Sequence, residues 1–146
     1  MKPFSLQAVL SYRQRLEEIA QYRLAEAKKT QETIKKKLAD EVTALTIFID
    51  ESESLQAKGI GITELIRHEG RITAQKHNIL AIEKNLVEKA SIVRREQQNL
   101  IHRSKERQIM EQLKETQNKA WLGYLNKKEA AMLDEIATTR HESGEF

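Results

Sequence analysis

The chain has 146 residues, of which 32% are charged and 5% aromatic, with one proline and five glycines, a balance typical of long helices that form coiled coils. It contains no cysteine, which excludes disulfides, thiol catalysis and thiolate metal sites. The formal net charge of +3 is mild, and its basic clusters are diluted by glutamate, so solvated helix faces are favoured over a nucleic-acid groove.

The N-terminal sequence MKPFSLQAVLSYRQR turns polar after a few apolar residues. It lacks the continuous apolar region and the small-residue cleavage site of a signal peptide. No apolar run elsewhere approaches the ~20 residues that cross a bilayer. We therefore expect a soluble cytoplasmic protein.

The glycines predict where the chain turns. In SLQAKGIGIT (54–63), Gly59 and Gly61 lie two residues apart, and Thr63 offers a hydroxyl as the N-cap of a following helix. We predict a first helix over about 4–56, a turn over about 57–63 and a second helix over about 64–138, with a frayed tail at 139–146. The fold class is all-α, and residues 1–146 form a single coiled-coil domain, a long two-helix antiparallel hairpin.

Apolar residues repeat every seven positions in the second helix, which predicts left-handed supercoiling against a partner helix. These residues are Leu65, Ile72, Ile79, Leu86, Val93 and Leu100. The apolar residues of the first helix have a spacing closer to 3.6 than to 3.5, so weaker supercoiling is expected there. They are Leu6, Val9, Leu16, Ile19, Leu24, Ile34, Leu38, Val42, Leu45 and Phe48.

A short turn makes the two helices antiparallel neighbours, and their apolar residues then face each other in one register over most of the first helix. In this register the first helix ends opposite Leu113, and the rest of the second helix overhangs. The overhang carries an apolar stripe of Trp121, Leu122, Leu125, Met132, Leu133 and Ile136. Such a surface is not expected to stay exposed in a free monomer. Either a second copy covers it, with weak self-association, or a different protein docks there.

Residue patterns that carry catalysis are missing. The four histidines lack metal-ligand spacing, no glycine-rich phosphate loop exists, and two helices offer no cleft that could desolvate a catalytic pair. We predict a protein that is not an enzyme, with no cofactor, no metal site and no small-molecule substrate.

Two stretches resemble the FliJ family of flagellar type III export proteins. One is FSLQAVLSYRQRLEEIAQYRLAEA (4–27), and the other is NKKEAAMLDEIATTR (126–140). Members of this family are small cytoplasmic antiparallel coiled coils, similar in fold to the gamma stalk of rotary ATP synthases. The resemblance therefore implies the same hairpin that the residue pattern predicts.

The resemblance also implies partners. Family members insert the coiled coil near both termini into the hexameric ring of the export ATPase and promote its assembly and activity. They also contact the cytoplasmic part of the export-gate membrane protein at the flagellar base and escort export chaperones. The residues that would meet the ATPase ring are Arg13, Arg15, Trp121, Leu125, Leu133, Asp134, Glu135, Ile136 and Arg140.

The family's gate-binding surface lies in the middle of the hairpin. The corresponding candidates here are Leu45, Phe48, Ile72 and Ile79. Where the family often has tyrosines on the first helix, this chain has ALTIFID (44–50), in which Phe48 is the one aromatic residue. Three alternatives stay open from the sequence: the equivalent stalk of a virulence type III secretion system, a basic coiled-coil nucleic-acid binder, and a purely structural homodimer.

Overall fold

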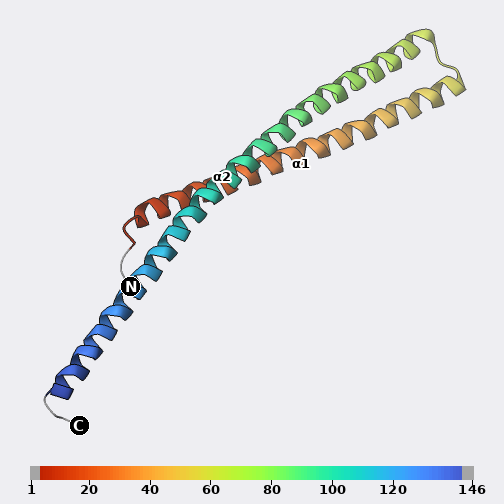
Figure 1. The fold of residues 1–146 in the computed structure, drawn as a ribbon. Helices are drawn as coiled ribbons and strands as arrows, with labels where there is room; N and C mark the ends of the chain where they lie inside the picture. Colours follow the sequence, from red (N-terminus) through yellow and green to blue (C-terminus); the bar gives the residue numbers. More distant parts are fainter. Residues whose placement is uncertain (1–3, 143–146) are drawn as a thin grey trace. The chain divides into compact units, whose positions relative to one another are not determined.

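A computed structural model describes residues 4–142, which form two helices and no strand (Figure 1). Helix α1 spans Gln7–Lys58 and helix α2 spans Ile62–Glu142. The helices pack against each other and run in opposite directions, which confirms the predicted all-α hairpin.

The turn between the helices is three residues long and depends on its glycines. Gly59 has a φ of 84°, a left-handed conformation that ends α1, and its N–H donates to the carbonyl oxygen of Gln56 at 3.1 Å. The carbonyl oxygen of Gly61 accepts the N–H of Leu65 at 3.1 Å, so Gly61 is the cap of α2. The prediction that Thr63 caps this helix is wrong, because Thr63 lies inside it.

The C-terminal end of α2 also differs from the prediction. A frayed tail was expected from residue 139, whereas the helix continues to Glu142. Side-chain hydroxyls of Thr138 and Thr139 donate to the carbonyl oxygens of Asp134 and Glu135, each at 2.9 Å, as threonine does within a regular helix. The last four residues of the predicted tail, 143–146, lie outside the described residues.

The chain divides into two compact units. Unit 1 contains the residues up to Glu18 and those from Ile101 on, whereas unit 2 contains Ile19–Leu100. In both units the buried and half-buried positions recur at alternating steps of three and four residues, and we call these positions the seam. This period of 3.5 residues is that of a left-handed coiled coil.

The seam of unit 2 is mainly apolar. Its members on α1 are Ala20, Leu24, Ala27, Gln31, Ile34, Leu38, Glu41, Leu45, Phe48, Ser52 and Leu55. Its members on α2 are Leu65, His68, Ile72, Gln75, Ile79, Ile82, Leu86, Lys89, Val93, Glu96 and Leu100. The seven-residue repeat predicted for the second helix is therefore confirmed.

Three polar members of the unit 2 seam have hydrogen-bond partners across or along the helices. The side-chain amide of Gln75 donates to the carbonyl oxygen of Glu41 at 2.9 Å and also to its carboxylate. Ser52, which is 3% exposed, accepts a hydrogen bond from the side chain of Gln56. These contacts satisfy polar groups that would otherwise be costly to bury.

The seam of unit 1 is mainly polar. Its members are Leu10, Arg13 and Glu17 of α1, and Arg103, Arg107, Met110, Lys114, Gln117 and Trp121 of α2. Only Leu10 and Met110 are buried, at 3% and 4% exposure. Apolar burial is therefore small in this unit, and polar contacts account for most of its inter-helix bonding.

The predicted apolar stripe of the first helix is wrong at its N-terminal end. Val9 and Ile19 are 38% and 45% exposed, whereas their neighbours Leu10 and Ala20 are buried. The seam keeps a period of 3.5 along α1 as well, rather than the spacing closer to 3.6 that its apolar residues suggest. The register is hidden in the sequence because polar or small residues occupy several seam positions.

Candidate partner-binding site

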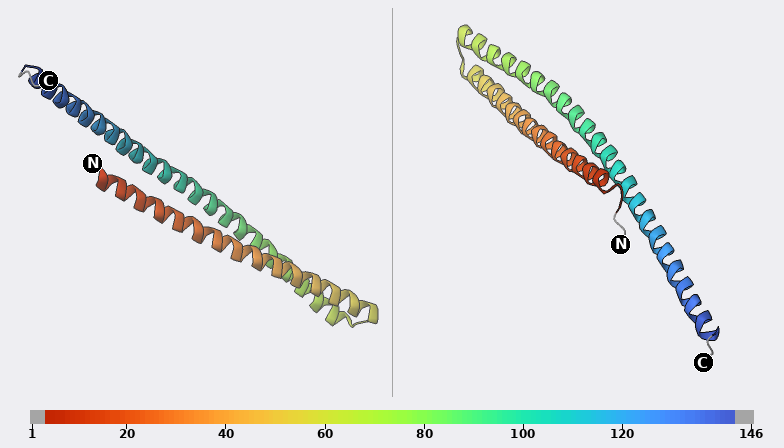
Figure 2. Two further views of the ribbon diagram at one scale, coloured as in Figure 1. Left: turned by 90° about the horizontal axis from the view of Figure 1, so that it is seen from below. Right: turned by 90° about the vertical axis from the view of Figure 1, so that its left-hand side faces the viewer.

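The overhang predicted from the sequence is the most exposed part of α2. Every residue from Leu122 to Glu142 is exposed, and Figure 2 shows no segment of α1 beside this blue end of the helix. The apolar residues of this segment are between 39% and 60% exposed. We call five of them the terminal stripe: Leu122, Leu125, Met132, Leu133 and Ile136.

The terminal stripe does not continue the seam of unit 1. Beyond Trp121 the seam register would pass through Tyr124, Lys128, Ala131 and Glu135, which are mostly polar or small. Four of the five stripe residues instead lie one residue further along, which is about 100° around the helix, and Leu133 lies two residues beyond Ala131. The stripe is therefore not a surface left bare by a first helix that is too short. It faces a different direction from the one in which α1 packs.

Trp121 belongs to the seam register and not to the terminal stripe, which corrects the sequence interpretation. It is half-buried, and its ring stacks on that of Tyr124 with centroids 5.5 Å apart. Together with Gln117 and Ala120, these rings line a shallow pocket on α2. Leu125, Leu133 and Ile136 are the predicted apolar contact residues that do lie on the stripe.

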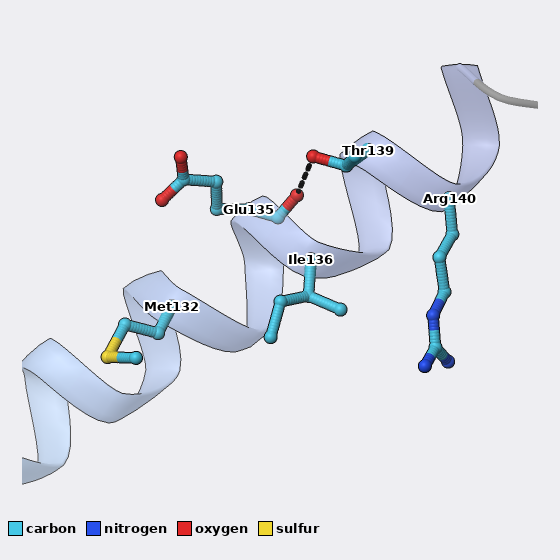
Figure 3. A pocket seen from close by; sticks show the side chains of 5 residues that line it. All are labelled: Met132, Glu135, Ile136, Thr139 and Arg140. Atoms are coloured by element: carbon cyan, nitrogen blue, oxygen red, sulfur yellow. Dashed lines mark hydrogen bonds between the residues drawn. The ribbon is translucent and has the colours of Figure 1, made fainter.

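A second shallow pocket lies near the C-terminal end of α2, with a volume of about 380 Å³ (Figure 3). Met132, Ile136 and Arg140 point to one side of the helix, and Glu135 and Thr139 point to the other. The first three are spaced by four residues and place a methionine, an isoleucine and a guanidinium along one line. This surface combines apolar area with a cation at its end.

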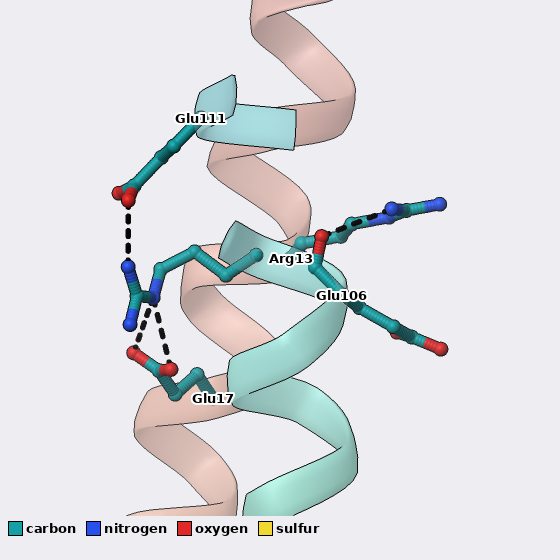
Figure 4. Close-up of polar contacts among 5 residues, drawn as sticks. Arg13, Glu17, Glu106 and Glu111 are labelled. Carbon is teal, nitrogen blue, oxygen red and sulfur yellow. Dashed lines mark hydrogen bonds and ion pairs between the residues drawn. The ribbon is translucent and has the colours of Figure 1, made fainter. Parts of the chain in front are cut away.

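The predicted basic residues near the N-terminus of α1 differ in their surroundings. Arg13 lies in the seam, and its guanidinium donates to the carbonyl oxygen of Glu106 at 3.0 Å (Figure 4). Arg15 is exposed. Of the two, Arg15 is the residue whose side chain is directed to solvent, whereas Arg13 joins the two helices of unit 1.

A charged cluster in unit 1 connects both helices. The Nε of Arg107 donates to both carboxylate oxygens of Glu17, each at 2.9 Å, and its Nη1 donates to Glu111 at 2.7 Å (Figure 4). The side chains of Glu17 and Arg107 are 13% and 24% exposed. The single N–H of Nε is thus shared between the two carboxylate oxygens of Glu17, and charge-assisted, partly desolvated hydrogen bonds of this kind are stronger than ordinary surface ion pairs.

This cluster changes the acidity of its members. A hydrogen bond from the Ser104 side chain, together with the hydrogen bond and charge of Arg107, lowers the pKa of Glu17 below its ordinary value of 4.5, although burial opposes the change. The hydrogen bond to Glu17 raises the pKa of Arg107. Both changes favour the charged pair at neutral pH.

The four residues predicted to meet an export gate all lie in the seam of unit 2. Ile79 is 8% exposed, and Leu45, Phe48 and Ile72 are half-buried. The guanidinium of Arg71 lies 3.6 Å from the ring centre of Phe48 and also pairs with Glu51 at 3.4 Å. Their first role in this structure is packing between the helices.

Sequence reasoning missed one apolar surface of unit 1. The sequence placed Val9 on the apolar face of the first helix, but the structure leaves it 38% exposed. Ile109, Leu113 and Tyr12 are likewise 54%, 47% and 57% exposed. A strict period of 3.5 residues would have revealed this surface, because each of these residues lies one position before a seam residue.

Residues 4–142 contain neither a cluster of metal ligands nor a membrane-spanning helix. No group of three histidine, aspartate or glutamate side chains there could hold a metal ion. No helix in the same range has both the length and the apolar content needed to cross a membrane.

The described residues thus form an antiparallel coiled coil of two helices, with the exposed terminal stripe near the C-terminal end of α2. The family model described as "Flagellar FliJ protein" matches residues 1–145. The chain therefore belongs to the FliJ family and is a protein related to flagellar type III export, which confirms the resemblance seen in the sequence. Neither the curated proteins nor the solved structures compared with it provide a match.

Proposed function

We propose that this protein is a non-enzymatic stalk that inserts unit 1 into the hexameric ring of the flagellar export ATPase and promotes the ring's assembly and activity. Membership of the FliJ family supports a role in flagellar export, and the two-helix coiled coil suits a stalk. The observation that carries the proposal is the terminal stripe, an apolar surface directed away from the helix that pairs with α2.

The stripe gives the docking its free energy. Complete burial of one leucine, isoleucine or methionine side chain contributes about 1.5–3 kcal/mol, and five such residues are half-exposed here. Association costs translational and rotational freedom, so only part of this sum appears as affinity. Docking through the stripe would therefore be specific and still reversible.

Charged residues around the stripe would set its orientation in the ring. Arg15 of α1 is exposed, and Asp134, Glu135 and Arg140 lie on α2 around the apolar residues. Exposed ion pairs contribute only about 0.2–1 kcal/mol each, so contacts of this kind exchange readily when the ring changes state.

The same proposal includes the family's other partners. We place the protein in the cytoplasm, peripherally associated with the inner membrane at the flagellar base, where it contacts the export gate and escorts export chaperones. Because Leu45, Phe48, Ile72 and Ile79 lie in the seam, gate binding through them would require the seam to loosen or the contact to use their exposed edges.

The test is the ATP hydrolysis rate of the purified export ATPase with and without this protein. Leu125→Asp combined with Ile136→Asp should abolish the stimulation, as should removal of residues 119–146. Ala131→Asp is the matched control, because Ala131 is equally exposed but lies on the opposite side of α2. Full stimulation by the Leu125→Asp, Ile136→Asp variant, with unchanged helical content, would refute docking through the stripe.

A further inference from the structure

A second heptad pattern follows the outer surface of α2 in unit 2. Residues spaced alternately by four and three positions form it, and we call them the outer stripe: Ile66, Gly70, Thr73, His77, Leu80, Lys84, Val87 and Ser91. All eight are exposed, with Ile66, Leu80 and Val87 at 62%, 60% and 68%. This period of 3.5 is that of a coiled-coil seam, although these positions do not face α1.

The outer stripe lies about 150° around α2 from the seam, counted at 3.6 residues per turn. It extends over roughly 38 Å at 1.5 Å per residue. A methyl group placed on Gly70 would meet nothing within 4 Å, so packing inside the monomer does not explain a residue that costs a helix about 1 kcal/mol. A large side chain from another helix would fit there.

We propose that the outer stripe binds the outer stripe of a second copy of this chain, with the two α2 helices antiparallel around a two-fold axis. The two outer stripes are paired over their full length, from Ile66 to Ser91. In this register Gly70 lies opposite the partner's Val87, and His77 lies opposite the partner's Leu80. Thr73 then faces the partner's Lys84, and Ile66 faces the partner's Ser91. A small or polar residue thus meets a larger one in each layer, as a self-complementary interface requires.

The charges beside the outer stripe identify the occupant. In an antiparallel coiled coil, the residues that flank the core contact the equivalent residues of the partner. This brings Arg67 beside the partner's Glu88, and Lys76 beside the partner's Glu83. The two-fold axis repeats both pairs, so the interface contains four ion pairs and no like-charged contact. Within residues 4–142 none of these four side chains has an ion pair of its own.

The remaining flanking positions agree with this register. Ala74 lies beside the partner's Ala81, and Glu69 lies beside the partner's Ala90, so no bulky pair keeps the helices apart. A parallel arrangement would instead place Glu83 beside the partner's Glu88, which is repulsive. The sequence of charges therefore selects the antiparallel dimer.

The dimer should be weak and reversible. Three apolar residues per chain supply the burial, while His77, Lys84 and Thr73 occupy layers where an apolar side chain would bind more strongly. Exposed ion pairs add only a few tenths of a kcal/mol each. We expect a dissociation constant on the order of tens of micromolar.

Sedimentation velocity of the full chain over a wide concentration range tests the proposal. The wild type should shift from monomer to dimer, and Leu80→Asp should raise the dissociation constant more than tenfold. Ile47→Asp is the matched control, because Ile47 is 49% exposed but lies on α1. A wild type that stays monomeric at several hundred micromolar, or a Leu80→Asp variant that dimerises as well as the control, would overturn the proposal.

Charge exchange tests the register. Lys76→Glu should weaken the dimer several-fold, because it places two glutamates beside each other, and adding Glu83→Lys should restore it. Failure of the double variant to recover would contradict the antiparallel pairing.

Crosslinking provides an independent measurement, because the natural chain has no cysteine. A mixture of Ala74→Cys and Ala81→Cys chains should be joined by a short bismaleimide far more efficiently than either chain alone. Equal crosslinking in all three samples would reject the register. The measurement uses this chain alone, so its result does not depend on binding to the export ATPase.

Discussion

The two units use the same coiled-coil geometry with opposite chemistry. In unit 2 the seam is filled mainly by leucine, isoleucine and valine, with Ile79, Ile82 and Val93 below 10% exposure. In unit 1 the seam contains Arg13, Glu17 and several basic residues of α2. Apolar burial in unit 2 provides stability that does not depend on the protonation of its members. Polar contacts in unit 1 provide specificity but less free energy.

This difference separates two tasks within one hairpin. A seam that is mainly apolar can hold α1 and α2 in a fixed register, because a shift by one residue would expose its whole apolar face. A seam held by charged groups can exchange its contacts for contacts with another protein with little net change in free energy. The weaker unit is also the one that contains the terminal stripe. Unit 1 is therefore the part that we expect to rearrange on binding.

The largest effect should come from the apolar seam. Ile82→Ala should lower the free energy of unfolding by about 2–3 kcal/mol, because Ile82 is 6% exposed and its loss leaves a cavity between the helices. Ile47→Ala, at an exposed position of α1, should lower it by less than about 0.5 kcal/mol. Urea unfolding followed by circular dichroism measures both. Equal losses would mean that the seam of unit 2 is not the main source of stability.

The next largest effect concerns the charged cluster of unit 1. Arg107→Met keeps the aliphatic stem but leaves the Glu17 carboxylate without its charged hydrogen-bond donor. We expect a loss of about 1–2 kcal/mol, most visible as faster hydrogen exchange of the amides near Glu17. Replacing both residues, with Glu17→Leu and Arg107→Met, should recover most of the loss. No recovery would show that the pair contributes more than its own desolvation cost.

Low pH should remove part of the stability that the Glu17–Arg107 pair contributes. The pKa of Glu17 is lower in the folded protein than its ordinary value of 4.5, so its stabilisation is complete above that value and is lost as the pH falls below it. The difference in unfolding free energy between the wild type and Glu17→Gln should therefore be larger at pH 7 than at about pH 3.5. A difference that grows towards acid pH would contradict the direction of the shift.

The smallest effect is expected for a similar ion pair on the surface of unit 2. Arg71 and Glu51 lie 3.4 Å apart, but each side chain is 49% exposed. Arg71→Met should cost less than about 1 kcal/mol even with the loss of the cation–π contact to Phe48. The comparison with Arg107→Met, measured under the same conditions, isolates the effect of burial. A larger loss at Arg71 would reverse the ranking of the two pairs.

The sequence predicted the fold well where large apolar residues coincide with the heptad. On α2 the line from Leu65 to Leu100 is apolar at every seventh position, so its register was readable. On α1 it was not, because Arg13, Glu17 and Ala20 occupy seam positions while Val9 and Ile19 are exposed beside them. A prediction that follows the apolar residues alone therefore places the packing face of α1 one residue too early.

The candidate site shows the same limit. The exposed terminal segment was predicted from the length of the first helix, but the direction of its apolar face was not. That direction depends on whether the stripe continues the seam register, and Trp121, the most prominent apolar residue, misled the assignment because it lies in the seam. Which protein binds the terminal stripe stays a prediction.

The three-residue turn at Gly59–Gly61 links the two helices so closely that neither can change length alone. One inserted residue in either helix would displace every later layer by about 1.5 Å and rotate it by about 100°. Removal of seven residues from each helix, at facing positions, would keep all remaining layers in place. The reach of unit 2 is thus adjustable in steps of one heptad pair, roughly 10 Å, while the turn and the terminal stripe stay as they are.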